Sequence, residues 1–416
     1  METIEAYLER KHREIELLNG CLERPRNPLR PRSVEEVIRV KFQLTAKLRA
    51  EHELQAWKAT ETAWSATARP ASGPFVFSYD YQRADLNVSG PSFYNLERGC
   101  TGETIYSASG MAAISSLLLA SGKILGRADI LVLPGSYGET QELIEHFVPE
   151  LRLVRLKLPL ADTLISANGS RILLLESCVA ANAFEAVLRC DGSALDLLIF
   201  DTTCFACRSG CIRRVLRWAR RCGVATALVR SHNKLDSLGA EYGRLGSAVL
   251  LTWSERSEAT LLLVEELAVE TRNAVRLLGG AALPAHFPPY VGSQAYWTLT
   301  KERVATILHN GRHAARHFAR ELPTLSDELH LYVTLRARLP FDEDTARQAA
   351  EAMSRDLSGE GFAIRHAGSF GFDFAATEWF HDATTDQYSV RVAVPDLPTD
   401  QWKVLAAAIA EWWRKS

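Results

Sequence analysis

Two residues that each follow an apolar run of the sequence could share one reaction. Asp201 ends the run LDLLIFD, and Lys234 follows the run ATALV in the segment RSHNK. Read singly, such an acid is more often a helix cap and such a lysine is more often solvated. Together they are the pair that pyridoxal-phosphate (PLP) chemistry needs: an amine that forms a Schiff base with the cofactor, and a carboxylate that keeps its pyridine nitrogen protonated. The pair predicts a PLP site centred on Lys234.

Two further segments could complete such a site. Ser109, Gly110 and Met111 lie at the start of the apolar stretch SGMAAISSLLLAS. A small-residue turn that leads into a helix exposes free N–H groups and the positive end of the helix dipole, which suits a phosphate. Tyr137, in PGSYGET, could stack its ring on a flat heterocycle. The alternatives are an ordinary helix start and a core tyrosine.

A parallel sheet is the element expected to position these residues. Residues 96 to 270 contain the apolar runs ADILVLPG, LRLVRLKL, RILLLES, LDLLIFD, ATALVRS and SAVLLTW. Runs of this length suit strands that are buried on both faces, and the helical stretches between them supply crossovers. We therefore expect an α/β fold whose ligand binds beyond the carboxyl ends of the strands.

The length of 416 residues predicts more than one hydrophobic core. We expect a helical N-terminal arm and linker at 1–95, a PLP-binding α/β domain at 96–272 and a smaller α+β domain at 273–416. The arm shows helical stripes without a core of its own, so it should pack on a larger body or on a partner subunit. Solvated decoration is the alternative.

Composition narrows the class of partner. Lys plus Arg (48) nearly balances Asp plus Glu (50), which disfavours nucleic acid and membrane surfaces as partners and favours a small molecule. The N-terminus lacks a long apolar stretch, so we expect a cytoplasmic protein with eight free cysteines. The triplet Cys204, Cys207 and Cys211 has no fourth ligand close by, so no metal is expected.

The order of the short motifs resembles the Cys/Met-metabolism branch of fold-type-I PLP enzymes, which includes cystathionine synthases and lyases. This sequence reads YQR, SGMAAI, YGET, an acid after LLIF, and S-x-x-K. The family reads roughly YSR, SGMAAI, YGGT, DNTF and S-x-T-K. The resemblance extends from about residue 79 to the C-terminus, and it implies the fold-type-I architecture.

The resemblance implies a role for each matching residue. The backbone amides of Gly110 and Met111 and the hydroxyl of Ser231 would bind phosphate, Asp201 would pair with the pyridine nitrogen, and Lys234 would carry the cofactor. The cofactor-binding residues expected in this way are Ser109, Gly110, Met111, Tyr137, Asp201, Thr203, Ser231 and Lys234.

Other matches concern the substrate and a second subunit. Tyr81 and Arg83 match a Tyr and an Arg that reach the phosphate of the neighbouring subunit, which implies a homodimer or homotetramer with shared sites. Arg391, in YSVRVAVP, matches the arginine that binds the substrate carboxylate, for which a guanidinium fork is suited. Ser369, in AGSFG, matches the serine of the family's SLGG.

These residues predict an enzyme that eliminates or replaces a group on the γ (or β) carbon of an amino acid. Lys234 would remove the Cα proton, with Tyr137 or Tyr81 assisting as acid or base. The leaving group would be a thiol, an activated homoserine oxygen, a halide or a sulfonium. Asn233 and Leu235 depart from the family pattern, which favours a role in specialised metabolism. The alternatives are a PLP aminotransferase or decarboxylase and a non-catalytic PLP-fold regulatory subunit.

Overall fold

The structure is a computed structural model with two compact units. It describes residues 2–28, 30–58, 71–79, 86–160, 169–322, 324–326, 330–337, 339–382 and 385–415. One unit, here called the sheet unit, comprises Leu54–Asn233 and Gly243–Phe287. The other, here called the terminal unit, comprises Met1–Glu53, Lys234–Tyr242 and Pro288–Ser416.

These units divide the chain at other points than the expected domains 1–95, 96–272 and 273–416. Helix α7 (Glu258–Leu277) belongs to the sheet unit, where it packs along α3 (Gly110–Leu125). Helix α1 (Ile4–Gly20) belongs to the terminal unit, where it packs on α8 (Gln294–Glu321). The N-terminal arm is thus built into a compact unit.

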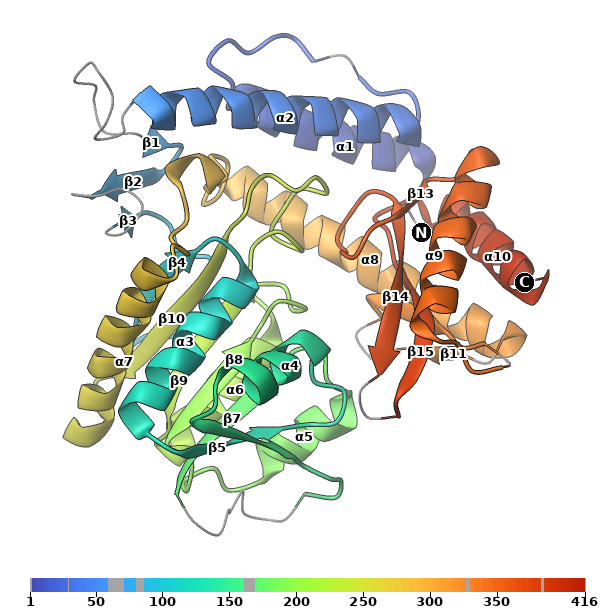
Figure 1. The fold of residues 1–416 in the computed structure, drawn as a ribbon. Coiled ribbons are helices and arrows are strands. Elements are labelled where there is room, and N and C mark those ends of the chain that lie inside the picture. The colour runs from blue at the N-terminus through green and yellow to red at the C-terminus, as the bar shows by residue number, and fades with distance from the viewer. Residues whose placement is uncertain are drawn as a thin grey trace. The chain divides into compact units, whose positions relative to one another are not determined.

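A seven-stranded sheet forms the body of the sheet unit (Figure 1). Its strands, in spatial order, are β4 (Cys100–Ser107), β10 (Gly246–Trp253), β9 (Ala225–Ser231), β8 (Leu197–Asp201), β7 (Ser170–Glu176), β5 (Ala128–Val132) and β6 (Leu151–Arg155). β10 runs antiparallel to both of its neighbours, and the other pairs are parallel. The expected α/β fold with a mostly parallel sheet is confirmed, and each apolar run quoted above forms one of its strands.

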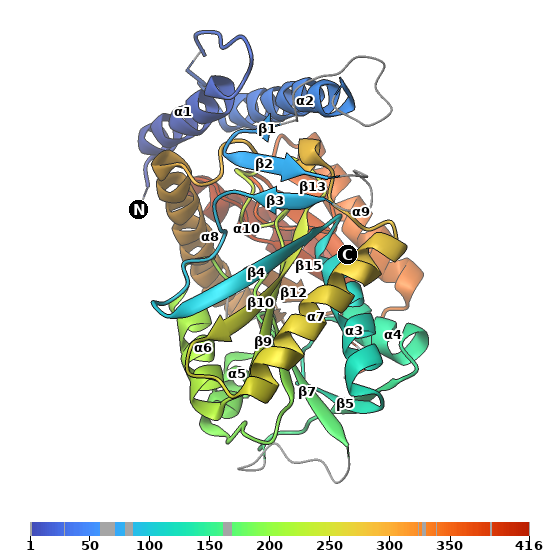
Figure 2. The ribbon, with the colours of Figure 1, turned by 90° about the vertical axis from the view of Figure 1, so that its left-hand side faces the viewer.

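Helices cover both faces of this sheet, which explains why its central strands are apolar along their length. Ile199 of β8 joins the core beneath α3 and α7, whereas its neighbour Phe200 points to the opposite face and contacts Phe184. Figure 2 shows α3 and α7 on one side of the sheet. The other helices of the unit are α4 (Gly138–Phe147), α5 (Ala181–Arg189), α6 (Gly210–Cys222) and the short η1 (Pro284–His286). A small second sheet contains β1 (Ala71–Ser72), β2 (Phe75–Ser78) and β3 (Asn87–Ser89).

The terminal unit contains a five-stranded sheet with helices packed on it. Its strands, in spatial order, are β11 (Thr324–Ser326), β12 (Tyr332–Leu335), β15 (Gln387–Ala393), β14 (Ala375–Asp382) and β13 (Ile364–His366). β13 and β14 are parallel, and the other pairs are antiparallel. Besides α1 and α8 its helices are α9 (Glu343–Gly359), α10 (Thr399–Lys415) and most of α2 (Val34–Lys58).

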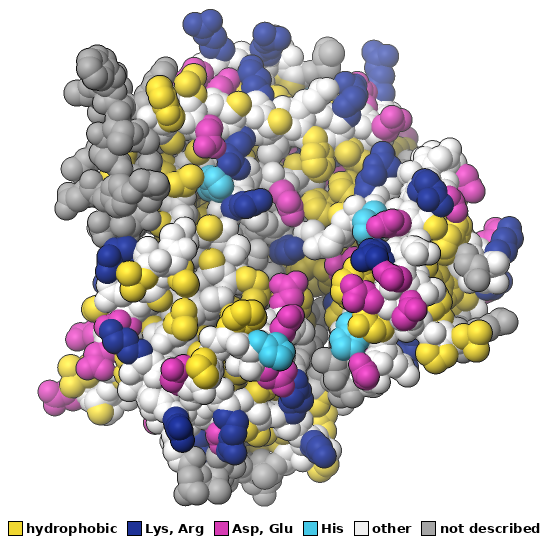
Figure 3. All heavy atoms as spheres, in the orientation of Figure 1, with side chains coloured by type: hydrophobic (Ala, Val, Ile, Leu, Met, Phe, Trp, Pro, Cys, Tyr) yellow, Lys and Arg dark blue, Asp and Glu magenta, His cyan; other side chains and the backbone are white. Residues whose placement is uncertain are grey.

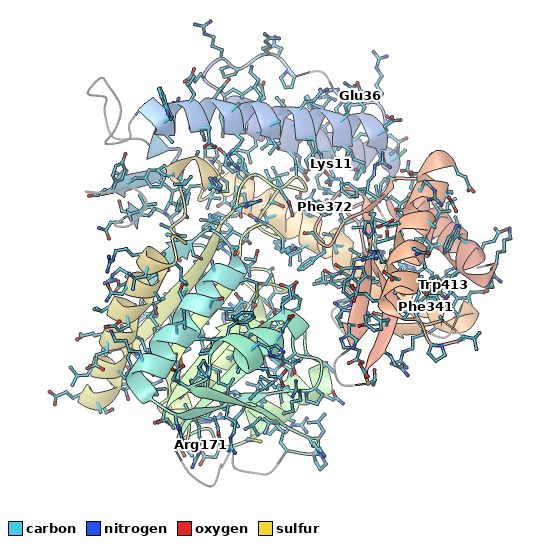
Figure 4. All side chains as sticks on the ribbon, in the orientation of Figure 1. Lys11, Glu36, Arg171, Phe341, Phe372 and Trp413 are labelled. Atoms are coloured by element: carbon cyan, nitrogen blue, oxygen red, sulfur yellow. The ribbon has the colours of Figure 1, made fainter. Side chains whose placement is uncertain are left out.

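A buried ion cluster joins the N-terminal helices to the rest of the terminal unit. Its cations are Arg10, Lys11, Lys41 and Arg303, and its acids are Glu14, Asp373 and Asp396. Three of the cations converge on Asp373: Nζ of Lys11 and Nζ of Lys41 each lie 2.5 Å from a carboxylate oxygen, and a guanidinium nitrogen of Arg303 lies 2.6 Å away. Figure 4 labels Lys11 on α1. Burial alone would raise the pKa of Asp373, but these cations hold it well below its usual range.

Charged side chains of both signs are interspersed on the face of the molecule drawn in Figure 3. Within the described ranges, no helix is both long enough and apolar enough to cross a membrane. The eight cysteines are free thiols.

Replacing Asp373 with Asn should strongly destabilise the fold, because three buried cations would lose one of the carboxylates that neutralise them. We expect the free energy of unfolding, measured by urea denaturation at neutral pH, to fall by about 3–5 kcal/mol. Asp344→Asn is the control, since Asp344 pairs with Arg347 at an exposed site and should contribute no more than about 1 kcal/mol. Equal stability of the two variants would contradict this account of the ion cluster.

Candidate active site

One group of candidate residues lies at the carboxyl ends of β8 and β9 in the sheet unit. Asp201 is the last residue of β8, and its Oδ1 accepts a hydrogen bond from the backbone N–H of Thr203 at 2.7 Å. Oγ1 of Thr203 accepts a hydrogen bond from the backbone N–H of Ser231, the last residue of β9, at 3.0 Å. These parallel neighbours end at the same edge of the sheet, so three of the expected cofactor residues form one hydrogen-bonded set.

The start of α3 packs directly against this set. A Cβ atom on Gly110 would lie 2.8 Å from Cβ of Ser231, closer than side-chain atoms can approach, so glycine is required there. Ser109 caps the helix: its Oγ accepts from the N–H of Ala112 at 3.0 Å. The N–H groups of Gly110 and Met111 belong to the first turn and have no partner within the helix, so they can bind a ligand next to the hydroxyl of Ser231. The Met111 side chain itself packs against the core.

Arg230 fixes the turn that follows Asp201. Its buried guanidinium donates to the carbonyl oxygens of Thr202 at 2.6 Å and Phe205 at 2.9 Å. Burial raises the pKa of Asp201, although hydrogen bonds from Thr203 and the charge of Arg230 partly oppose this. A cationic N–H group beside Asp201 would supply the charge that favours its ionised form.

Tyr137 precedes α4 and is tied to the same edge of the sheet through a buried glutamate. The backbone N–H of Tyr137 donates to Oε2 of Glu176 at 2.8 Å, and the hydroxyl of Thr140 donates to Oε1 at 3.1 Å. Glu176 ends β7 and is paired in register with Asp201. Tyr137 is 39% exposed, so its ring is accessible to a ligand.

A second group of candidate residues surrounds Lys234 in the terminal unit. Nζ of Lys234 donates to Oγ of Ser369 at 2.8 Å, and this hydroxyl donates to Oε1 of Glu241 at 3.2 Å. The amine also lies 5.6 Å from the centre of the Phe370 ring. The structure thus brings together two of the expected site residues, Lys234 and Ser369.

The segment 369–374, with the sequence SFGFDF, connects Lys234 to the ion cluster. Gly371 has a φ of 92°, and a Cβ there would lie 2.9 Å from the carbonyl oxygen of Lys234, so this position requires glycine. Its carbonyl accepts a hydrogen bond from Arg303 at 2.7 Å. Two residues later, Asp373 binds the three cations described above. Figure 4 labels Phe372, whose ring stacks on Phe374 with centroids 4.6 Å apart. The ion cluster therefore holds the segment that contacts Lys234.

Arg391 lies on β15 in the same unit and belongs to an aromatic cluster that also reaches Lys234. Its guanidinium carbon lies 3.2 Å from the ring centre of Phe380 and 5.1 Å from that of Tyr332. The Tyr332 ring contacts the Phe370 ring at 5.4 Å. Among the described residues, Nε of Arg391 is buried without a hydrogen-bond partner, so the guanidinium retains capacity to bind a carboxylate.

Tyr81 and Arg83 lie outside the described residues. Sequence reasoning missed Glu176 and Glu241. Glu176 ends an apolar run as Asp201 does, so the same pattern could have revealed it. Glu241 has no such signal, because its contact with Ser369 spans 128 positions of the chain. No group of three or more His, Cys, Asp or Glu residues within the described part could hold a metal ion.

No protein-family model matches this sequence, and no curated protein matches it. Among solved structures, that of MetB from Corynebacterium glutamicum is similar, with a TM-score of 0.51 at 14% sequence identity. The match covers 74% of this chain and 80% of that chain. The chain shares the fold of this protein. The resemblance noted in the motifs is thus accompanied by a similarity of the three-dimensional fold.

The protonation of the Glu176 carboxyl group should make the free energy of unfolding depend on pH. Burial, followed by the charge of Asp201, raises the pKa of Glu176 from 4.5 to about 8. At neutral pH the folded protein therefore holds a proton that the unfolded chain releases. The contribution of this proton to the free energy of unfolding is complete below pH 4.5 and is lost as the pH rises through about 8. Between about pH 6 and about pH 8 we expect this group to remove about 2 kcal/mol from the free energy of unfolding.

Glu176→Gln should lack this contribution, because the amide cannot ionise and can still bond Tyr137 and Thr140. The measurement is urea unfolding of the wild type and the variant at both pH values. Glu142→Gln, at an exposed position of α4, should behave like the wild type. If Glu176→Gln kept the full pH dependence of the wild type, Glu176 would not be protonated in the folded protein.

Proposed function

We propose that this protein is a PLP-dependent enzyme that acts on an amino acid and eliminates or replaces a group on its γ (or β) carbon. The observation that carries the proposal is the set formed by Gly110, Asp201, Thr203 and Ser231, with Lys234 only three residues further along the chain. A lysine, a carboxylate and a set of phosphate donors are what the cofactor requires.

The chemistry of the residues in the sheet unit fits PLP. The N–H groups of Gly110 and Met111 and the hydroxyl of Ser231 would bind the phosphate. Asp201, whose pKa is raised by burial, would accept a hydrogen bond from the protonated pyridine nitrogen, which would restore its charged form. The exposed ring of Tyr137 would stack on the cofactor. Bound PLP supplies an electron sink that stabilises negative charge at the Cα atom of an amino acid.

Lys234 would bind the cofactor covalently and then, once the amino acid has taken its place, move the Cα proton with its Nζ atom. Ser369 supports this role because its hydroxyl orients the amine at 2.8 Å. For loss of a group from the γ carbon a second proton must move, and Lys234 would transfer it with help from Tyr137 or Tyr81.

Arg391 would bind the substrate carboxylate. Its flat guanidinium is held between the rings of Phe380 and Tyr332, so its orientation is fixed before a carboxylate arrives. The similarity to MetB supports an amino-acid substrate, and the changes at Asn233 and Leu235 support a leaving group or nucleophile specific to this protein.

The decisive test combines an absorption spectrum with product analysis. The purified protein is reconstituted with PLP and treated with L-homocysteine, O-acetyl-L-homoserine, γ-chloro-α-aminobutyrate and S-methyl-L-methionine, which represent the four classes of leaving group. Formation of 2-oxobutyrate and ammonia, or of a γ-substituted product when a thiol is added, supports the proposal. A keto acid that retains the γ group, with the cofactor left in its amine form, would instead indicate transamination. A colourless protein even with added PLP would leave a non-catalytic subunit as the better account.

Lys234→Ala should abolish the visible absorbance of the lysine-bound cofactor and lower the rate of turnover by about 10³-fold or more, because both the covalent attachment and the proton carrier are lost. Lys301→Ala is the matched control, since Lys301 is exposed on α8. An unchanged spectrum of Lys234→Ala would overturn the assignment.

Arg391→Lys should raise KM for the amino acid by about 10- to 100-fold and leave kcat within about threefold of the wild type, because an ammonium cannot form the two parallel bonds of a guanidinium. Steady-state kinetics on whichever panel member is converted provide the measurement. Arg365→Lys, at an exposed arginine of β13, controls for the loss of the guanidinium. An unchanged KM would remove Arg391 from the substrate site.

A further inference from the structure

We propose that Glu241 takes up, through the hydroxyl of Ser369, the proton that Lys234 removes from the substrate, and passes it to solvent. This inference rests on the proposed function, because it concerns how Lys234 is returned to its basic form. Glu241 would act through Ser369 and not on the substrate, so it is a positioning residue that also receives a proton.

The geometry is an unbranched chain of hydrogen bonds. Nζ of Lys234 lies 2.8 Å from Oγ of Ser369, and this oxygen lies 3.2 Å from Oε1 of Glu241. A serine hydroxyl can accept one proton while it donates another, which is the property that a relay needs. Lys234 and Glu241 are seven positions apart in one segment, so Ser369 bridges the two ends of that segment.

The burial of the three residues changes along the chain of bonds. Lys234 is partly buried, Ser369 is 7% exposed, and Glu241 is exposed. A proton that leaves the amine therefore passes through a shielded hydroxyl to a carboxylate in contact with water.

Packing holds both ends of the relay in place. Tyr242, the residue after Glu241, is buried; its hydroxyl bonds to Nδ1 of His52 at 2.6 Å, and its carbonyl accepts from Arg49 at 3.1 Å. Ser369 belongs to the segment that Asp373 anchors in the ion cluster. The backbone carbonyl of Lys234 accepts a hydrogen bond from the hydroxyl of Ser237 at 2.8 Å. The donor, the bridge and the acceptor are thus held by separate contacts, which favours a defined relay over a chance contact.

The proton balance is simple. The ammonium of Lys234 loses a proton to Oγ of Ser369 while the hydroxyl proton of Ser369 moves to Oε1 of Glu241, so one N–H bond and one O–H bond break and two O–H bonds form. Glu241 then releases the proton to water. At the end of the cycle the serine hydroxyl is intact and the amine is neutral.

The test counts Cα proton exchange for each turnover. The holoenzyme is incubated in D₂O with the four amino acids of the panel above, and deuterium at Cα of the recovered substrate is measured by mass spectrometry together with product formed. In Glu241→Gln the amide oxygen can still accept the Ser369 hydrogen bond but cannot take the proton. We expect the number of exchanges per turnover to fall by about tenfold or more, with the cofactor absorbance unchanged.

Two further variants complete the test. Ser369→Ala should lower the exchange per turnover as Glu241→Gln does, and Glu302→Gln, which removes an exposed carboxylate of α8 that pairs with Arg13, should leave it unchanged. A purely structural role of Glu241 would lower turnover and exchange together and would overturn the proposal, as would wild-type exchange in Glu241→Gln. A wild type that binds no PLP or converts no panel member refutes the proposed function itself, and the relay with it.

Discussion

The carboxylate of Asp373 is the constraint on which the terminal unit depends. It neutralises Lys11 of α1, Lys41 of α2 and Arg303 of α8, so elements far apart in the sequence must converge on it. Since a buried charge without a partner is costly, these elements can pack in few other ways. The same acid lies in the segment 369–374, which begins at Ser369 and passes Lys234 at Gly371. A charge cluster without a direct catalytic role thus fixes the surroundings of the central amine.

In the sheet unit, short polar contacts at the ends of the strands fix the positions of the proposed cofactor-binding residues. Asp201, Thr203 and Ser231 are linked by backbone N–H groups, and Gly110 brings the helix start against them. Arg230 closes the turn with bonds to two carbonyl groups. Because backbone atoms make these contacts, the positions of the functional side chains follow from the fold itself. The chain then runs from Ser231 to Lys234 within three residues, so the cofactor's proposed attachment point is tied covalently to its proposed binding site.

Local sequence patterns predicted the strands of the large sheet well. Features that depend on contacts between residues remote in sequence could not be predicted. Continuous apolar runs predicted β5 and β7 to β10, whose residues are mostly buried on both faces, and also the edge strand β6. The other edge strand, β4, was missed because its first half is exposed and polar. Asp201, Ser231 and Gly110 were expected together, and they meet. Asp373 could not be foreseen, since its partners at positions 11, 41 and 303 are remote in sequence. The N-terminal helices were expected to form a separate arm. They instead belong to one unit with the C-terminal residues, because acids near the C-terminus neutralise their buried charges.

The central claim is that Lys234 carries PLP covalently. Its most direct test is reduction of the PLP-reconstituted protein with borohydride, followed by proteolysis and mass spectrometry of the peptides. The account predicts a phosphopyridoxyl group on the peptide that contains Lys234 and on no other lysine. A label on a different lysine, or no label at all, would contradict it.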